Sequence, residues 1–576
     1  ADTCSQFIPC DKFHREGNKM RRRTRPINRR SMFVAFFSLF AVTTALSQTG
    51  SSPEQNRKSP SIKLRTSLVL VPAVVTDRLG APVAGLTRNS FTVLENGHPQ
   101  KIAFFEHIQT QAEPVRRTVA APGTFTNTIE ASSQRLTIFV MDLLNSSIAE
   151  QENGRDELVK LFSKSGGIKE PFCLLTLDSD GLTVIHDFTT DPTLLAEALK
   201  QVKEHASAKD APQINPMELT YRNFHGWHTR SVNRAIATLA GRASLLASAI
   251  RSQAITETLR TRLTLEALRE IGEAFVGMPG RKSLIWATGG FPFEIDDPSQ
   301  FGARERDLLP EYEKAWRALN RADIAVYPLD VEQLASTALV SASVGQPLPE
   351  HFDIRSNVTN LERFADVTGG KLCDRSTDAE TCFRKATTDS SDYYLLGFYQ
   401  GSATTKSGWQ KLSVRTNVPN VQVRARAGYY LSERRDDLHT REEDLQTALA
   451  SPLDYTAIPL TVRWTATLKW EGNEKRRVGF SFAVPLAAVK LEDEEGGHLS
   501  LEFAAMATSE TGASVGSFLQ TADGKLSEGV AKALKSNGVI CQGTIDLPPG
   551  EYTMSFAVRD NLNGQIGTVS APLTVH

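Results

Sequence analysis

The chain has 576 residues, too many for one hydrophobic core, and its length predicts about three to five structural units. Its 65 basic and 66 acidic residues leave a formal net charge of -1, so the chain as a whole has no electrostatic drive toward nucleic acid or an anionic membrane. A composition of 40% hydrophobic and 23% charged residues is typical of a globular protein rather than a disordered one.

Residues 1–47 have the pattern of a leader that contains a secretory signal peptide. Arginine-rich sequence precedes an apolar segment at residues 32–46, which is short for a membrane-spanning helix. The small residues Ala45 and Ser47 predict cleavage before Gln48. We therefore expect a periplasmic or extracellular protein without a stable transmembrane anchor after cleavage.

Two linkers and a small β domain are predicted next. Residues 48–62 are polar and turn-rich, as is usual for a linker. From 63 to 110, strand-like runs alternate with turn signals such as Glu95-Asn96-Gly97, which predicts a small domain of the β-sandwich kind. Residues 111–134 lack apolar periodicity and are predicted to be a second linker.

The run Arg-Leu-Thr-Ile-Phe-Val-Met-Asp at residues 135–142 predicts a central strand of an α/β sheet. Ligands of open α/β sheets bind beyond the carboxyl ends of the strands, where Asp142, Asn145, Ser146 and Ser147 would lie. Their hard oxygen atoms suit an ion such as Mg²⁺. The alternative is that Asn145 or Ser146 caps the following helix while Asp142 accepts hydrogen bonds from nearby backbone amides.

Strand-like and helix-like segments alternate between residues 135 and 433, which predicts a mostly parallel sheet flanked by helices. One such helix carries Leu265, Leu268 and Ile271 at helical spacing. Residues of about 201–260 are polar and then helical without a strand, and they are predicted to be an insertion.

Several motifs in this region resemble the secreted bacterial proteins related to the von Willebrand factor type A domain. The motifs are residues 135–142, the helix start Thr264-Leu265-Glu266-Ala267-Leu268, Gly280-Arg281-Lys282-Ser283-Leu284-Ile285-Trp286, Tyr327-Pro328-Leu329-Asp330, Tyr393-Tyr394-Leu395-Leu396-Gly397 and Arg426-Ala427-Gly428-Tyr429-Tyr430. The resemblance covers about residues 63 to 433. It implies a Rossmann-like domain at 135–433, on a fold that mainly supports adhesion and protein binding.

The resemblance also places three metal-binding loops on this sequence. Asp142 and Ser146 match the first and last positions of Asp-x-Ser-x-Ser, and Thr264 matches the threonine of the second loop. Leu144 replaces the middle serine, and Gly289 stands where the third loop has an aspartate. With two donors missing, the resemblance implies a degenerate site that binds Mg²⁺ weakly. Its candidate ligands are Asp142, Asn145, Ser146 and Thr264.

Cys373 and Cys382 flank a polar loop, and in an exported chain we predict a disulfide between them. Their spacing fits no zinc motif.

Residues 434–460 are charged and are predicted to be a linker with one helix. Regular strand-like runs separated by turns at 461–576 predict a carboxyl-terminal antiparallel β-sandwich.

Two motifs raise the possibility of catalysis. Gly512-Ala513-Ser514-Val515-Gly516 matches the nucleophile-elbow string, but its β-rich surroundings lack the strand-to-helix turn that the motif requires, so we interpret it as a chance match. His225 and His228 could share a metal, but they lack the glutamate and helical context of a metalloprotease, which favours a surface pair. No catalytic residue or organic cofactor is predicted.

Together these patterns predict a secreted, non-enzymatic adhesion module that binds a protein or another envelope or extracellular macromolecule, and not nucleic acid. One alternative is an extracytoplasmic hydrolase that uses Ser514 or the loop of His225. Another is a structural scaffold of an envelope assembly.

Overall fold

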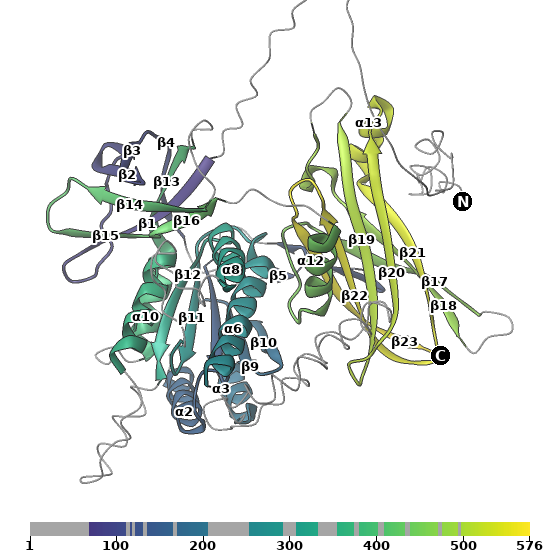
Figure 1. The fold of residues 1–576 in the computed structure, drawn as a ribbon, viewed down its shortest axis with the longest axis horizontal. Coiled ribbons are helices and arrows are strands. Elements are labelled where there is room, and N and C mark those ends of the chain that lie inside the picture. The colour runs from purple at the N-terminus through teal and green to yellow at the C-terminus, as the bar shows by residue number, and fades with distance from the viewer. Residues whose placement is uncertain are drawn as a thin grey trace, which may run out of the picture.

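The computed structural model describes residues 68–110, 116–117, 121–130, 135–164, 170–204, 253–291, 307–331, 354–373, 379–400, 408–431, 438–469, 475–492 and 497–576. The predicted leader and linker at 1–62, most of the predicted insertion, and the pair His225 and His228 lie outside these ranges. The described residues form an α/β unit and two β-sandwiches (Figure 1). No helix within these ranges is both long and apolar enough to cross a membrane.

The amino-terminal sandwich combines strands from two distant parts of the chain in two four-stranded sheets. One sheet contains, in order, β15 (Val421–Ala425), β1 (Leu68–Asp77), β13 (Asp392–Tyr399) and β4 (Ile102–Gln109). The other contains β16 (Gly428–Leu431), β14 (Gly408–Thr416), β2 (Phe91–Glu95) and β3 (His98–Gln100), with the short helix η2 (Arg88–Ser90) before β2. Figure 1 shows the purple early strands beside the green later ones.

The strands at residues 392–431 correct a predicted domain boundary, because the sequence assigns them to the α/β unit. β13 pairs antiparallel with both β1 and β4 and is therefore a central strand of the sandwich. Its buried Leu396 and Phe398 join Val71 and Val93 in one apolar core. An apolar pattern shows that a strand has a buried face, but it does not show which strands supply the hydrogen-bonding neighbours.

The α/β unit has a five-stranded sheet in the order β10-β9-β8-β11-β12. Its parallel strands are β8 (Leu136–Asp142), β9 (Phe172–Asp178), β11 (Lys282–Thr288) and β12 (Ile324–Asp330). β10 (Gly181–Thr189) is antiparallel to β9 at one edge. Numbered along the chain, the strands run 3-2-1-4-5, so the order reverses between β8 and β11. Open α/β sheets bind ligands beyond the carboxyl ends of the strands at this switch point.

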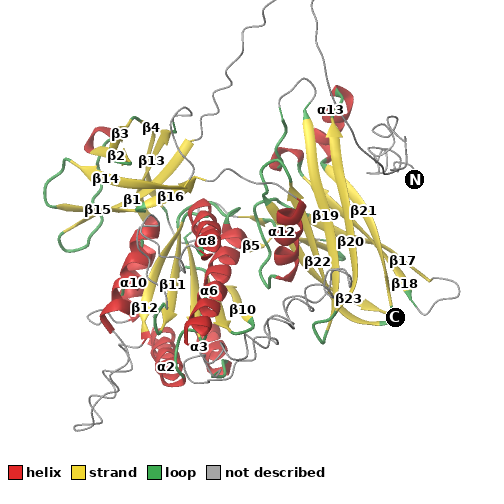
Figure 2. Ribbon diagram, viewed as in Figure 1, coloured by secondary structure: helices red, strands yellow, loops and turns green. Residues whose placement is uncertain are grey.

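Helices cover both faces of this sheet (Figure 2), because the side chains of its central strands alternate between two apolar cores. Along β8, Ile138 and Val140 enter one core, whereas Phe139 and Met141 enter the other. The first core also contains residues of α6 (Gln253–Phe275), α8 (Leu309–Arg321) and α10 (Ile354–Thr368). The second contains residues of α2 (Ile148–Lys164), α3 (Pro192–Gln201) and α11 (Ala379–Ser391).

Helix α6 corrects two predictions. It begins at Gln253, so the last residues of the insertion predicted at about 201–260 belong to this helix. Thr264, predicted at a helix start, lies in the middle of it. The preceding residues Thr256-Glu257-Thr258-Leu259-Arg260 contain no glycine or proline, so nothing in the sequence stops the helix there.

The carboxyl-terminal sandwich has two four-stranded sheets whose strands pair antiparallel, as predicted. One contains β21 (Val539–Leu547), β18 (Arg476–Val484), β17 (Thr461–Lys469) and β6 (Thr124–Thr126). The other contains β20 (Ser514–Lys525), β19 (His498–Ser509), β22 (Gly550–Asp560) and β23 (Ile566–Val575). The helices η4 (Leu486–Ala488) and α13 (Glu528–Asn537) connect strands, and β5 (Arg116–Arg117) pairs with β7 (Ile129–Glu130).

Both predicted linkers with described residues are packed against folded units. β6, from the linker predicted at 111–134, pairs with β17, and the side chain of Asn127 donates to the carbonyls of Tyr455 and Ile458 at 2.7 and 2.9 Å. In the linker predicted at 434–460, helix α12 (Leu438–Ala450) packs on the sandwich through Leu445 and Leu449. Both segments are therefore part of the folded structure, because their apolar side chains are buried and the amide of Asn127 is hydrogen-bonded.

Candidate functional site

The carboxyl edge of β8 carries a buried polar cluster at the switch point of the sheet. Asp142 is the last residue of β8, and its exposed fraction is 1%. Asn145, Ser146 and Thr264 are also buried. The structure therefore brings together all four candidate ligands predicted from the sequence, from the loop after β8 and from the middle of α6.

Four donors surround the carboxylate of Asp142. Its Oδ1 accepts the backbone N–H of Asn145 at 2.9 Å. Its Oδ2 accepts the Nδ2 of Asn145 at 2.8 Å, the Nε1 of Trp286 at 3.0 Å and the hydroxyl of Thr288 at 2.8 Å. Burial raises the pKa of Asp142, and the hydrogen bonds from Asn145 and Thr288 oppose that rise.

Trp286 and Thr288 are site residues that the sequence reasoning missed. Both lie on β11, two residues apart, so they face the same side of the sheet beside β8. A buried indole N–H requires an acceptor, and a threonine that ends an apolar strand is a polar group at the ligand-binding edge. Those two signals could have identified them, although their shared acceptor is visible only once β8 and β11 are paired.

Asn145 connects the carboxylate to α6. Its Nδ2 also donates to the Oγ1 of Thr264 at 2.9 Å, and its Oδ1 accepts the Nε of Arg260 at 3.1 Å. The hydroxyl of Thr264 in turn donates to the carbonyl of Arg260 at 2.8 Å. The bond from Arg260 fixes which end of the Asn145 amide faces the carboxylate.

The residue that caps α2 is Ser147, and not Asn145 or Ser146 as the alternative prediction has it. The backbone N–H of Ser147 donates to Oε2 of Glu150 at 2.7 Å, and the backbone N–H of Glu150 donates to the hydroxyl of Ser147 at 3.4 Å. This reciprocal pair is a capping box. Ser146 has a different task, since its hydroxyl accepts the backbone N–H of Gly289 at 2.9 Å.

Gly289 is required by close packing in the third loop. A Cβ atom at this position would lie 2.2 Å from Oε2 of Glu150 and 2.9 Å from the carbonyl oxygen of Asn145. The Glu150 carboxylate, held by the capping box, therefore occupies the space into which an aspartate side chain at 289 would extend.

The donor set present here does not fit a Mg²⁺ ion. Magnesium needs near-octahedral oxygen ligands with available lone pairs. The carboxylate of Asp142 is already engaged by four donors, and Asn145 turns its NH₂ group, not its oxygen, toward it. Within the described residues, no group of three or more His, Cys, Asp or Glu side chains is arranged to hold a metal ion.

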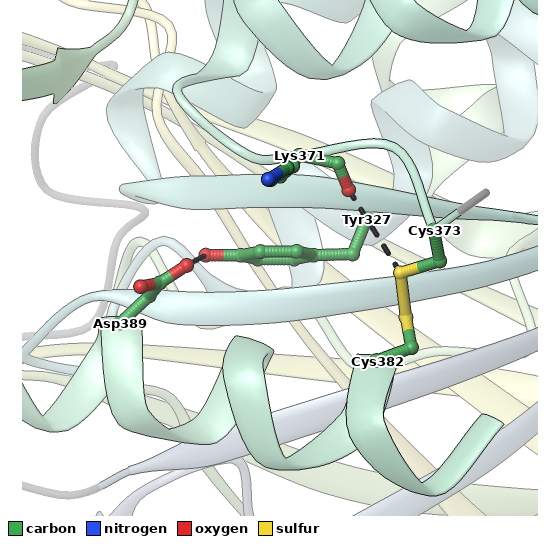
Figure 3. The surroundings of a disulfide bond; sticks show 5 residues. All are labelled: Tyr327, Lys371, Cys373, Cys382 and Asp389. Carbon is green, nitrogen blue, oxygen red and sulfur yellow. Dashed lines mark hydrogen bonds between the residues drawn. A yellow bond between two sulfur atoms is a disulfide. The ribbon is translucent and has the colours of Figure 1, made fainter. Parts of the chain in front are cut away.

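The other candidate residues lie elsewhere. Cys373 and Cys382 form a buried disulfide that ties the segment after α10 to α11. It lies beside Tyr327, whose hydroxyl donates to Asp389 at 2.9 Å (Figure 3). Ser514 begins β20, the second strand of a hairpin with β19. That position is not the strand-to-helix turn on which a nucleophile elbow depends.

Comparisons with known proteins identify no family for this chain. Neither a family model nor a curated protein matches it. Among solved structures it has a similarity to an endonuclease/exonuclease/phosphatase from Beutenbergia cavernae, with 12% identity, 33% of this chain and 39% of that chain covered, and a TM-score of 0.12. A similarity at this TM-score carries no argument about fold or function.

Proposed function

We propose that the protein is an exported, non-enzymatic module that binds a partner macromolecule, and that its α/β unit is related to the von Willebrand factor type A domain. The partner is a protein or another macromolecule of the envelope or the extracellular space. Export rests on the signal-peptide pattern at residues 1–47. Amino-terminal sequencing of the native protein, with Gln48 as the expected first residue, tests it.

One observation carries the proposal. Asp142, Ser146 and Thr264, which the resemblance assigns to two loops, lie together with Gly289 of the third loop at the switch point of a doubly wound sheet. Binding sites of open α/β sheets occupy this position. The proposal includes no catalytic group: Ser514, the serine of the nucleophile-elbow string, begins a hairpin strand and does not lie on a strand-to-helix turn.

An exposed apolar residue at the rim of this edge provides a test. Ile148, the first residue of α2, is 40% exposed next to the polar cluster. Leu194, in the first turn of α3, is 44% exposed. It lies at the opposite edge of the sheet from Ile148, because α3 follows β10, which runs antiparallel to β9. Aspartate is favourable in the first turn of a helix, so both positions accept it without loss of the helix.

The experiment is affinity capture from envelope and culture-medium fractions with the mature chain and with the Ile148→Asp and Leu194→Asp variants. We expect a partner that is enriched by the mature chain and by Leu194→Asp, and lost with Ile148→Asp. Equal recovery with both variants would place binding outside this edge. Absence of any specific partner would remove the binding function itself.

A further inference from the structure

Arg260 is a buried, positively charged residue beside the candidate site. It lies on α6 one turn before Thr264, and its exposed fraction is only 8%. Its Nε donates to Oδ1 of Asn145 at 3.1 Å, and its positive charge favours the ionised form of Asp142. A cationic group is therefore already built into the cluster in which the resemblance implies a metal ion.

The hydrogen bonds form a closed circuit. Arg260 donates to Asn145, Asn145 donates to both Asp142 and Thr264, and Thr264 donates back to the carbonyl of Arg260. Trp286 and Thr288 complete the shell of Asp142 from β11. A metal ion that bound Oδ2 of Asp142 would have to displace the three side-chain donors there. An ion at either carboxylate oxygen would also lie near the positive charge of the buried Arg260, which costs free energy in a buried site.

We propose that Arg260 takes the place of a divalent cation, so that the cluster is a cation-independent lock that holds α6 against β8 and β11. If the protein binds a partner as proposed above, the partner binds at this edge without a divalent ion. This consequence for recognition rests on the proposed function. The inference differs from the metal site implied by the resemblance, and it follows from the donors and the charge that this chain supplies.

The first test concerns the mature chain alone. Calorimetric titration with Mg²⁺ and with Mn²⁺ should give no saturable heat, and the thermal unfolding midpoint should be the same in EDTA as in millimolar Mg²⁺. A saturable site of micromolar affinity that raises the midpoint and is lost in Asp142→Ala would overturn the proposal.

The second test asks whether the charge of Arg260 acts on Asp142. Arg260→Gln should lower the unfolding midpoint, and Arg260→Lys should restore part of the loss because it restores the charge. Arg262, two residues along the same helix, is exposed, so Arg262→Gln is the matched control and should leave the midpoint unchanged. In an Asp142→Asn background, Arg260→Gln should lower the midpoint by much less, since the carboxylate it compensates is gone.

A loss from Arg260→Gln that is equal in both backgrounds would show that the arginine only packs, and would overturn the role assigned to its charge. Partner binding is measured in a separate experiment. Capture of the partner by the mature chain should persist in EDTA, and capture that EDTA abolishes would contradict cation independence. If no partner is captured at all, the proposed function fails while the ion and unfolding measurements still decide the role of Arg260.

Discussion

The indole Nε1 of Trp286 donates to Oδ2 of Asp142 at 3.0 Å, across the pair of strands at which the order of the sheet reverses. This bond joins β11 to the end of β8 through side chains, in addition to their backbone ladder. A buried carboxylate that keeps four donors is a satisfied structural group, and its neighbours are held in one arrangement.

Loss of the indole donor should be measurable. Trp286→Phe removes the N–H and some ring volume, so we expect the free energy of unfolding to fall by about 2 to 4 kcal/mol, from the lost hydrogen bond and the smaller ring together. Urea denaturation measures it. In an Asp142→Asn background the same substitution should cost less, and an unchanged cost would show that the bond to Asp142 contributes nothing.

A side chain added at Gly289 in the third loop should destabilise the fold, and it should not restore metal binding. Gly289→Ala puts a methyl group against Glu150 and the backbone of Asn145, and overpacking of this kind costs roughly 1 to 3 kcal/mol. Gly529 in α13 has no atom within 4 Å of such a methyl, so Gly529→Ala is the control and should be neutral or stabilising. Gly289→Asp should likewise destabilise; tighter Mg²⁺ binding by that variant would contradict the geometry of this loop.

The capping box predicts different effects for two substitutions of Ser147. Ser147→Ala should lower the free energy of unfolding by about 1 kcal/mol because it removes the N-cap of α2. Ser147→Gly should cost only a few tenths of that amount, since glycine is tolerated at an N-cap. Chemical denaturation of both variants checks the role, and equal losses would argue against a cap at this residue.

The disulfide should contribute to stability. It closes a loop with a sequence separation of 9 residues, for which the chain-entropy model gives about 2 to 3 kcal/mol. We expect Cys373→Ser/Cys382→Ser to lower the free energy of unfolding by about that amount under non-reducing conditions. Mass spectrometry of non-reduced peptides gives the direct check, and two free thiols in the native protein would contradict the bond.

Glu270 should make stability depend on pH near neutrality. It lies on α6, where its Oε2 accepts the hydroxyl of Ser451 at 2.9 Å, and burial raises its pKa to about 7, from 4.5, with the charge of Glu266 adding to the rise. A raised folded-state pKa means that the folded chain holds a proton that the unfolded chain has lost, so this stability is complete below about pH 4.5 and is lost as the pH rises through about 7.

The matching variant is Glu270→Gln, which cannot lose a proton. We expect it to be more stable than the natural chain at pH 8 by roughly 1 to 3 kcal/mol, and the difference to shrink toward pH 5. Unfolding curves across this range measure it. Glu266→Gln, at an exposed position on the same helix, is the control and should produce a smaller change. A difference that is constant with pH would contradict the raised pKa.

Local properties of the sequence by themselves determined much of the architecture of this protein. The apolar run of β8, the alternation of strands and helices after it and the turn-separated strands at the carboxyl terminus predict an α/β unit with β units beside it, because hydrophobic period and turn residues are local properties. The same reasoning placed Asp142 and Asn145 at the carboxyl edge of the sheet, and it paired Cys373 with Cys382.

Tertiary structure decided what those residues do. Sequence order placed β13 in the wrong unit, because a strand's neighbours are chosen by long-range pairing that its own pattern does not encode. Thr264 and Arg260 reach Asn145 only because α6 packs on the face of the sheet beside β8. Whether a carboxylate binds an ion depends on which donors already surround it, and the donors of Asp142 come from the loop after β8 and from β11, which are far apart in the chain.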